Sequence, residues 1–354
     1  MEKNFLISTG GSGGHVVPAL TLHEHLSKIA NIVISTDKRG LRYIDENIYT
    51  CEIIDTPKLD NIFFYPFKFF LILFLTFKSF FLLKRRKILK VFSTGGYMSL
   101  PLILSSRLLK IKIYLIEPNQ VLGRANRFFL KHCSKIFCYT DELINFPLNY
   151  RNKMVKIDPL VKKHIYKLKI LPEQNKKFTL LVVGGSQGAD IFDKNLKNVL
   201  IEVFKETPIR IIQQTSNNNV SLLSEFYSKN NVENKIFSFE KSFENIIKQA
   251  DLCISRGGAS TLAEMSLINI PFIVVPLPSA KDNHQYENAK FYKNKDCCWI
   301  IAQDNFDVQI EEVLKSIINS KDDLLKKKHN LKILNNKNSW SNVNQKILEN
   351  LDEN

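Results

Sequence analysis

Four short apolar runs along the chain are each followed at once by glycines. The runs are Phe5–Ile7, Val91–Phe92, Leu180–Val183 and Leu252–Ile254, and eleven of the 13 glycines lie in the clusters behind them. Continuous apolar runs, without polar alternation, are typical of strands buried on both faces, as in a parallel sheet covered by helices. A stretch able to start a helix follows each glycine turn. The pattern therefore predicts an α/β fold in which a strand, a glycine turn and a helix are repeated.

Two of these turns, at Gly10 and Gly184, look like the first turn of a nucleotide-binding sheet and lie about one domain length apart. They predict two Rossmann-like, doubly wound domains in tandem. The lysine-rich stretch 158–177 is the predicted linker, with a boundary near residue 162. In the polar tail, apolar residues recur at helical spacing. We therefore expect one domain to comprise residues 1–161 with a C-terminal helix at about 335–354, and the other to comprise residues 162–334.

One aromatic segment departs from this pattern. Residues 63–83 read FFYPFKFFLILFLTFKSFFLL and precede the basic cluster Lys84–Lys87. Lys68 and Lys78 interrupt the run and leave residues 69–77 without charge, whereas a bilayer span needs roughly 20 apolar residues. An aromatic helix beside a basic cluster is typical of an element lying in the membrane interface. We expect residues about 63–87 to contact an anionic membrane surface, with a buried helix and a membrane span as open alternatives.

Composition narrows the class of partner. Lysine and arginine total 50 against 35 acidic residues, a formal net charge of +15, which implies nucleic acid, anionic lipid or a phosphorylated small molecule. Hydrophobic residues make up 44% of the chain, enough for one large core or two ordinary ones. A mainly disordered chain is therefore excluded. The six cysteines show no CxxC pair, and no secretory signal precedes the first apolar run. We expect a cytosolic chain with reduced thiols.

The first glycine turn is a candidate anion site. Its glycines allow a ligand to approach the backbone, and the amides at the start of the following helix would face an anion. Val16 stands where a dinucleotide fingerprint needs a third glycine, although Asp37 lies at about the right distance for a ribose carboxylate. NAD binding is therefore weakened and stays open. A helix N-terminus favours the neutral imidazole of His15, which can accept a proton, and capping of the turn is the alternative role.

The second half offers two further turns. Gly184–Gly188 contains Ser186 and is expected to hold phosphate oxygens. The turn from Ser255 leads into a helix carrying Glu264, which either binds ribose hydroxyls or simply favours the positive helix end. The sequence contains no DxD triplet, HExxH or P-loop GxxxxGK. A diphosphate donor would instead be neutralised by helix ends, without a metal ion.

Five motifs in order resemble those of the MurG family, the UDP-N-acetylglucosamine:lipid I N-acetylglucosaminyltransferases of peptidoglycan synthesis. They are GGSGGHVVPAL from Gly10, STGGYMSLP from Ser93, EPNQVLGRAN from Glu117, VVGGSQGA from Val182, and SRGGASTLAE from Ser255 with KDNHQYENA from Lys281. The resemblance implies a GT-B fold whose two domains face a cleft. It implies an inverting, metal-independent transfer without a cofactor from UDP-N-acetylglucosamine to the C4 hydroxyl of the muramyl sugar, giving lipid II. It also implies a peripheral protein on the cytoplasmic side of the inner membrane that binds no nucleic acid.

The resemblance also implies a role for each matching residue. The first domain would dock to the membrane and hold the lipid-linked acceptor, through Gly11, Ser12, Gly13, Gly14, Gly96, Tyr97, Asn119 and Asn126. The second would hold the donor, through Ser186 and Gln187 at the diphosphate, Glu264 at the ribose, Phe239 near uracil, and Gln285, with His284 beside it, at the glucosamine. Gly188, Gly258 and Ala259 would also bind substrate. His15 is the expected base, with Glu117 as runner-up or positioning group.

The chain departs from the family pattern at a few positions. Pro118 replaces a glutamine beside Glu117, and Lys162 or Lys163 would have to replace an arginine at the junction between the domains. Three alternative functions stay open: a related transferase with another lipid acceptor such as diacylglycerol, a dehydrogenase or epimerase of soluble sugar nucleotides, and a basic scaffold or nucleic-acid binder.

Overall fold

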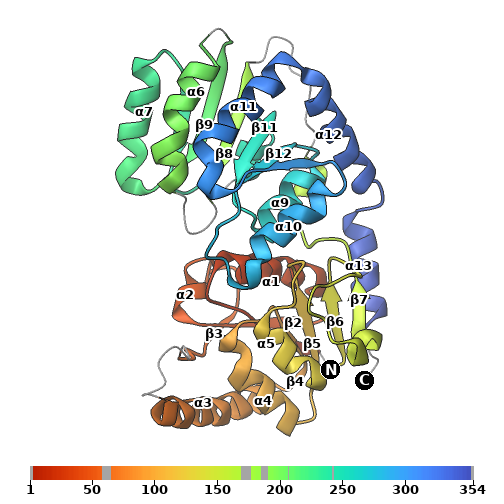
Figure 1. Ribbon diagram of the computed structural model, residues 1–354. Helices are drawn as coiled ribbons and strands as arrows, with labels where there is room; N and C mark the ends of the chain where they lie inside the picture. The colour runs from red at the N-terminus through yellow and green to blue at the C-terminus, as the bar shows by residue number, and fades with distance from the viewer. Residues whose placement is uncertain are drawn as a thin grey trace. The chain divides into compact units, whose positions relative to one another are not determined.

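The computed structural model describes residues 3–57, 65–168, 177–184, 190–205, 207–240 and 243–351. The chain divides into two compact units, each with its own sheet (Figure 1). Unit 1 comprises Met1–Lys162 with Trp340–Asn354, and unit 2 comprises Lys163–Ser339. The chain thus leaves unit 1 once and returns to it with its last helix.

Unit 1 is built on a parallel sheet of seven strands in the order β3-β2-β1-β4-β5-β6-β7. The strands are β1 (Asn4–Ser8), β2 (Asn31–Thr36), β3 (Cys51–Ile53), β4 (Ile88–Ser93), β5 (Lys112–Glu117), β6 (Lys135–Cys138) and β7 (Met154–Lys156). The helices are α1 (Gly13–Leu26), α2 (Lys38–Leu41), α3 (Tyr65–Arg85), α4 (Leu100–Leu108), α5 (Arg124–Phe129) and α13 (Trp340–Glu349). The strand order reverses between β1 and β4, as in a doubly wound fold.

Both faces of this sheet are buried, as the continuous apolar runs predicted. Phe5 and Ile7 of β1 pack with Phe92 on one face, in a cluster that includes residues of α1 and α13. Leu6, which points the other way, packs with residues of α3 and α4. The ring of His25 on α1 stacks on Trp340 at the start of α13, with ring centroids 3.6 Å apart, and fixes the last helix to the unit.

Unit 2 contains a parallel sheet of six strands in the order β10-β9-β8-β11-β12-β13. The strands are β8 (Phe178–Val183), β9 (Ile209–Gln214), β10 (Glu233–Phe237), β11 (Leu252–Ser255), β12 (Phe272–Val274) and β13 (Cys298–Ile300). The helices are α6 (Lys197–Val203), α7 (Val220–Lys229), α8 (Phe243–Ile247), α9 (Ala259–Leu267), α10 (His284–Lys293), α11 (Phe306–Asn319) and α12 (Lys321–Leu334). The strand order reverses between β8 and β11, so the prediction of two doubly wound α/β domains is confirmed.

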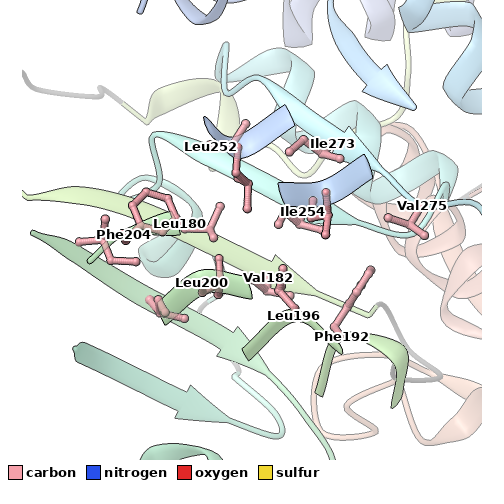
Figure 2. Packing of buried hydrophobic residues seen from close by; sticks show 14 of the residues in the cluster. Leu180, Val182, Phe192, Leu196, Leu200, Phe204, Leu252, Ile254, Ile273 and Val275 are labelled. Carbon is pink, nitrogen blue, oxygen red and sulfur yellow. The ribbon is translucent and has the colours of Figure 1, made fainter. Parts of the chain in front are cut away.

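The core of unit 2 is also built from apolar strand residues that helices cover (Figure 2). Leu180 and Val182 of β8 pack beside Leu252 and Ile254 of β11, and residues of α6 and α11 cover them. A five-residue π-helix, Phe192–Leu196, precedes α6 and places Phe192 in this core. Phe192 and Val275 lie at the same end of the cluster in Figure 2.

The helical tail is divided between the units. Residues 335–339, which we expected in the last helix, follow the end of α12 in unit 2, and the last helix begins at Trp340. The side chain of Asn335 donates hydrogen bonds to the carbonyl oxygens of Ser266 and Leu331, each at 2.9 Å. These bonds satisfy carbonyl groups at two helix ends and tie this segment to α9.

The aromatic segment forms α3, which lies beside α4 (Figure 1). By length and composition the helix over Pro66–Arg85 is apolar enough to cross a membrane. Of its most apolar 18-residue stretch, 33% is buried in the protein. One face packs on the unit through Leu75, Leu82 and Leu83. The opposite face exposes an aromatic stripe at heptad spacing, formed by Phe67, Phe70, Phe74, Phe77 and Phe81. The helix therefore belongs to the packed unit along one side and is apolar on its outer side.

Candidate active site

Three of the predicted loops meet at the carboxyl edge of the unit 1 sheet. The Gly10–Gly14 turn follows β1, the Gly95–Gly96 turn follows β4 and Glu117 ends β5, on adjacent strands. Ligands of open α/β sheets bind at this edge, where the strand order reverses. Gly10 has φ 152° and Gly96 has φ 84°, values that L side chains rarely adopt. The glycines are therefore required by the shape of the edge.

His15 is held in one tautomer. Its Nδ1 lies 2.7 Å from the carbonyl oxygen of Thr94, which follows β4. Because a carbonyl can only accept, Nδ1 carries the proton and Nε2 of the neutral ring keeps a free lone pair. Nε2 makes no hydrogen bond to any described residue and lies 3.9 Å from where a Cβ on Gly96 would stand. His15 is thus positioned to accept a proton between the two glycine turns.

The N–H groups of the first turn differ in whether they already donate a hydrogen bond within the protein. The Gly11 amide donates to Asp37 Oδ1 at 2.8 Å, so its N–H is already used. Ser12 is the N-cap residue of α1, and its side chain makes no capping bond. The first helical residues, Gly13 and Gly14, follow it, and N–H groups at this position have no partner within the helix. The Ser12 amide donates to the Gly10 carbonyl at 3.1 Å, so the amides of Gly13 and Gly14 and the hydroxyl of Ser12 remain to hold an anion.

Asp37 stabilises this turn by accepting hydrogen bonds. It is buried and accepts hydrogen bonds from the amides of Gly11 and Gly40 and from Arg39. Burial acts to raise the pKa of Asp37, but these hydrogen bonds outweigh it and hold the pKa below its usual range. The Arg39 guanidinium also donates to the Tyr97 hydroxyl. The carboxylate that NAD binding would use for a ribose is therefore occupied by the protein, a link the sequence reasoning missed.

Glu117 organises the loop that follows β5. Its side chain is 2% exposed and accepts four hydrogen bonds. Oε1 accepts from the Asn119 amide at 3.2 Å and from Asn119 Nδ2 at 3.0 Å. Oε2 accepts from the Gly123 amide at 2.8 Å and from Asn126 Nδ2 at 2.9 Å. Both oxygens are occupied, which favours a positioning role for Glu117 over proton abstraction.

Asn126 connects the loop that follows β5 to the glycine turn that follows β4. It is buried, and Nδ2 also donates to the carbonyl of Ile116 at 3.0 Å. A Cβ on Gly95 would lie 3.2 Å from the Asn126 side chain. Oδ1 of Asn126 has no hydrogen-bond partner among the described residues. Asn119 and Asn126 are thus brought together by Glu117.

Gln285 joins two loops at the carboxyl edge of the unit 2 sheet. Its Oε1 accepts from the amide of Gly257, after β11, at 3.2 Å and from the amide of Leu277, after β12, at 3.0 Å. Asn288, one turn further along α10, donates to the Gly257 carbonyl at 3.0 Å. A Cβ on Gly257 would lie 2.2 Å from the Gln285 carbonyl oxygen. The amide oxygen of Gln285 is therefore structural, which leaves its NH₂ group for a ligand.

The other predicted donor residues differ in their settings. Gly258 is the N-cap residue of α9, Ala259 is its first residue, and Glu264 lies half-buried further along it. Phe239 is 73% exposed after β10. His284 is half-buried, and its Nδ1 lies 2.8 Å from the Lys281 carbonyl. Ser186, Gln187 and Gly188 lie outside the described residues.

The described residues contain no group of three His, Cys, Asp or Glu side chains that could hold a metal ion. The cysteines there are all free. Burial raises the pKa of Cys133 and of Cys297 to about 11, so neither thiol is a ready nucleophile. The described groups at the two edges are an imidazole that can accept a proton and backbone and side-chain amide donors.

Comparisons with known proteins agree with this geometry. The N-terminal domain model of glycosyltransferase family 28 matches residues 5–138 and the C-terminal domain model matches residues 179–343. A Pelagibacter ubique (strain HTCC1062) protein, named "UDP-N-acetylglucosamine--N-acetylmuramyl-(pentapeptide) pyrophosphoryl-undecaprenol N-acetylglucosamine transferase", is 42% identical over 100% of both chains. A protein of the same name from Rickettsia canadensis (strain McKiel) is 33% identical, and the match covers 90% of this chain and 92% of the relative.

Among solved structures, Acinetobacter baumannii MurG has a TM-score of 0.75 at 24% identity, with 99% of each chain covered. This likeness confirms the expected GT-B fold, and the named relatives confirm the resemblance carried by the five motifs. The chain belongs to glycosyltransferase family 28.

Proposed function

We propose that this protein transfers N-acetylglucosamine from UDP-N-acetylglucosamine to the C4 hydroxyl of the muramyl sugar of lipid I, giving lipid II for peptidoglycan. The full-length relative at 42% identity carries the name of this activity, as does the Rickettsia canadensis relative, and both names specify a muramyl acceptor rather than diacylglycerol. The observation that carries the proposal is His15. The Thr94 carbonyl holds its Nδ1, which leaves Nε2 as the proton acceptor between two glycine turns at the carboxyl edge of a doubly wound sheet.

The acceptor binds to unit 1. Gly13, Gly14 and Ser12 at the start of α1 hold oxygens of the lipid diphosphate, because these groups keep donors for an anion and the helix end attracts negative charge. Gly11 contributes close backbone approach, since its amide is used by Asp37. Gly96, Tyr97, Asn119 and Asn126 border the muramyl sugar.

The donor binds to unit 2. The start of α9, with Gly258 and Ala259, and the glycine turn containing Ser186, Gln187 and Gly188 hold the diphosphate. Glu264 accepts hydrogen bonds from the ribose hydroxyls, and Phe239 lies near uracil. The NH₂ group of Gln285 donates to a glucosamine hydroxyl, because its oxygen is engaged by Gly257 and Leu277. His284 lies beside it as the first residue of α10.

The transfer is a direct displacement. The acceptor hydroxyl oxygen attacks the anomeric carbon as the bond from that carbon to the UDP oxygen breaks, and the bonding pair leaves on the diphosphate. The hydroxyl proton passes to His15 Nε2, while the Nδ1 proton donated to Thr94 stabilises the imidazolium that forms. Glu117 shapes the acceptor loop. The reaction needs no redox cofactor, and helix ends neutralise the leaving group.

The aromatic face of α3 docks the enzyme to the cytoplasmic side of the inner membrane. Its exposed stripe of five phenylalanines would leave water there, and the side chains of Lys84 and Lys87 at the end of the helix are exposed and suit anionic headgroups. The opposite face is fixed to the unit by buried leucines, and Ser105 of α4 donates to the Thr76 carbonyl at 2.6 Å. We therefore favour a helix lying in the interface over one crossing the bilayer.

A transfer assay tests the proposal. The purified full chain is mixed with radiolabelled UDP-N-acetylglucosamine and either lipid I or diacylglycerol in mixed micelles, and labelled lipid is counted. We expect labelled lipid II to form in the reaction with lipid I and no labelled lipid to form in the reaction with diacylglycerol. No transfer to lipid I by folded protein would refute the proposed function, and transfer to diacylglycerol would favour the alternative acceptor.

A further inference from the structure

Buried serines lie directly behind the carbonyl group that holds His15. Ser93 ends β4 and Ser99 ends the 3₁₀ helix Tyr97–Ser99, so the two serines flank the second glycine turn. Ser93 and Ser99 are each 0% exposed, and Ser8 at the end of β1 is 1% exposed. A substrate cannot reach these hydroxyl groups. Any effect that they have on the reaction must therefore pass through the residues that they contact.

Two of these hydroxyl groups close a ring of hydrogen bonds with Gly95, which we call the serine–glycine ring. The Gly95 amide donates to Ser93 Oγ at 3.1 Å, Ser93 Oγ donates to Ser99 Oγ at 2.8 Å, and Ser99 Oγ donates to the Gly95 carbonyl at 3.2 Å. The directions are fixed because an amide N–H can only donate, a carbonyl can only accept, and each hydroxyl has one hydrogen. Ser8 Oγ adds a further donor to Ser99 Oγ at 3.1 Å. Both backbone groups of Gly95, which has φ 86°, are therefore held from the buried side.

The serine–glycine ring sets the direction of the Thr94 carbonyl. This carbonyl and the Gly95 amide belong to one planar trans peptide group and point to opposite sides of it. On one side the carbonyl lies 2.7 Å from His15 Nδ1, and on the other the amide donates to Ser93. Thr94 is also held to β1, because its amide donates to the Ser8 carbonyl at 3.2 Å. A shift of Ser93 would therefore turn the acceptor that fixes the tautomer and the orientation of the imidazole.

We propose that Ser93 and Ser99 are positioning residues for His15, because through the serine–glycine ring they hold the Thr94 carbonyl in place while the base takes up the proton. The proposal rests on the proposed function, since it takes His15 to be the base of the transfer. When Nε2 receives the hydroxyl proton, the positive imidazolium binds the Thr94 carbonyl more strongly than the neutral imidazole does. Hydrogen bonds in a chain polarise one another, so the bond from the Gly95 amide to Ser93 makes the Thr94 oxygen a better acceptor.

A double-mutant cycle in the lipid I transfer assay separates this role from a purely structural one. The full chain is prepared as wild type, Ser93→Ala, His15→Ala and the double variant, and kcat is measured together with UDP affinity by calorimetry. We expect Ser93→Ala to lower kcat about 10-fold and His15→Ala to lower it roughly 100-fold or more. UDP affinity should stay within about twofold, because the donor binds to unit 2. The double variant should lie within about threefold of His15→Ala, because the ring then has no base to position.

Ser106→Ala is the matched control. Ser106 is also fully buried in unit 1, but its hydroxyl donates to the Leu102 carbonyl at 2.7 Å within α4, so its removal should leave kcat within about twofold of the wild type. Ser99→Ala breaks the serine–glycine ring at its other serine and should lower kcat as Ser93→Ala does. Circular dichroism checks that each variant is folded.

Two results would overturn the assignment of Ser93 and Ser99. One is an unchanged kcat in folded Ser93→Ala and Ser99→Ala. The other is a double variant whose kcat falls a further 10-fold or so below that of His15→Ala, because Ser93 would then act independently of the base. Failure of the proposed function looks different, because folded wild-type protein would then form no lipid II at all.

Discussion

The replacement Glu117→Gln tests how the acceptor loop is held. Glu117 is buried and accepts four N–H groups, two on each oxygen, from Asn119, Gly123 and Asn126. A glutamine keeps one oxygen, and its NH₂ group then faces two donors whichever way the amide turns. Hydrogen bonds to a charged group contribute about 1.5–3 kcal/mol each. Loss of two, offset by turning an asparagine amide, predicts a decrease of about 2–4 kcal/mol in the unfolding free energy.

Urea unfolding at neutral pH measures this decrease. Glu142→Gln is the control, because Glu142 is exposed in the same unit and should change stability by less than about 0.5 kcal/mol. In the transfer assay we expect Glu117→Gln to lower kcat/KM less than His15→Gln does, because the base is His15. A variant as stable as the wild type would refute the network. A loss of kcat/KM as large as that of His15→Gln would favour Glu117 as the base.

Three further changes test other parts of the account. His15→Gln should lower kcat by roughly 100-fold or more with UDP affinity intact, and steady-state kinetics showing a loss below threefold would reduce His15 to a cap. Asp37→Asn should destabilise the protein by about 1–3 kcal/mol at pH 7. Because the folded pKa of Asp37 is depressed, this difference should shrink as the pH falls below the ordinary value of 3.8, and a constant difference in urea unfolding would contradict it. Phe74→Ser with Phe77→Ser should weaken partitioning into anionic vesicles by roughly 30-fold, since two largely exposed rings contribute about 2 kcal/mol or more. Leu222→Ser, an exposed apolar residue of unit 2, should leave vesicle binding unchanged in co-sedimentation.

The strands and glycine turns were predictable because their signals are local. A buried parallel strand needs a continuous apolar run, and a turn at φ 77° such as Gly11 needs glycine. These two requirements located the ligand edge of both sheets from the sequence alone. They also placed His15 at the mouth of the first turn, although only the contact with Thr94 fixes its tautomer.

The supporting contacts were not predictable, because they join residues far apart in the chain. Nothing near Asp37 in the sequence shows that its carboxylate holds Gly11, and nothing near Gln285 shows that its oxygen bridges Gly257 and Leu277. Periodicity also misled the reading of the tail, because helical spacing continues across the break between α12 and α13.

The most direct test compares wild-type enzyme and His15→Gln in the lipid I transfer reaction, run with EDTA and followed by counting lipid-linked disaccharide, with UDP affinity measured in parallel. We predict that the wild type forms product at the same rate with and without chelator, and that His15→Gln binds UDP normally yet forms product at about 1% of that rate or less. Transfer that requires a divalent cation, or near-normal transfer by His15→Gln, would contradict the account.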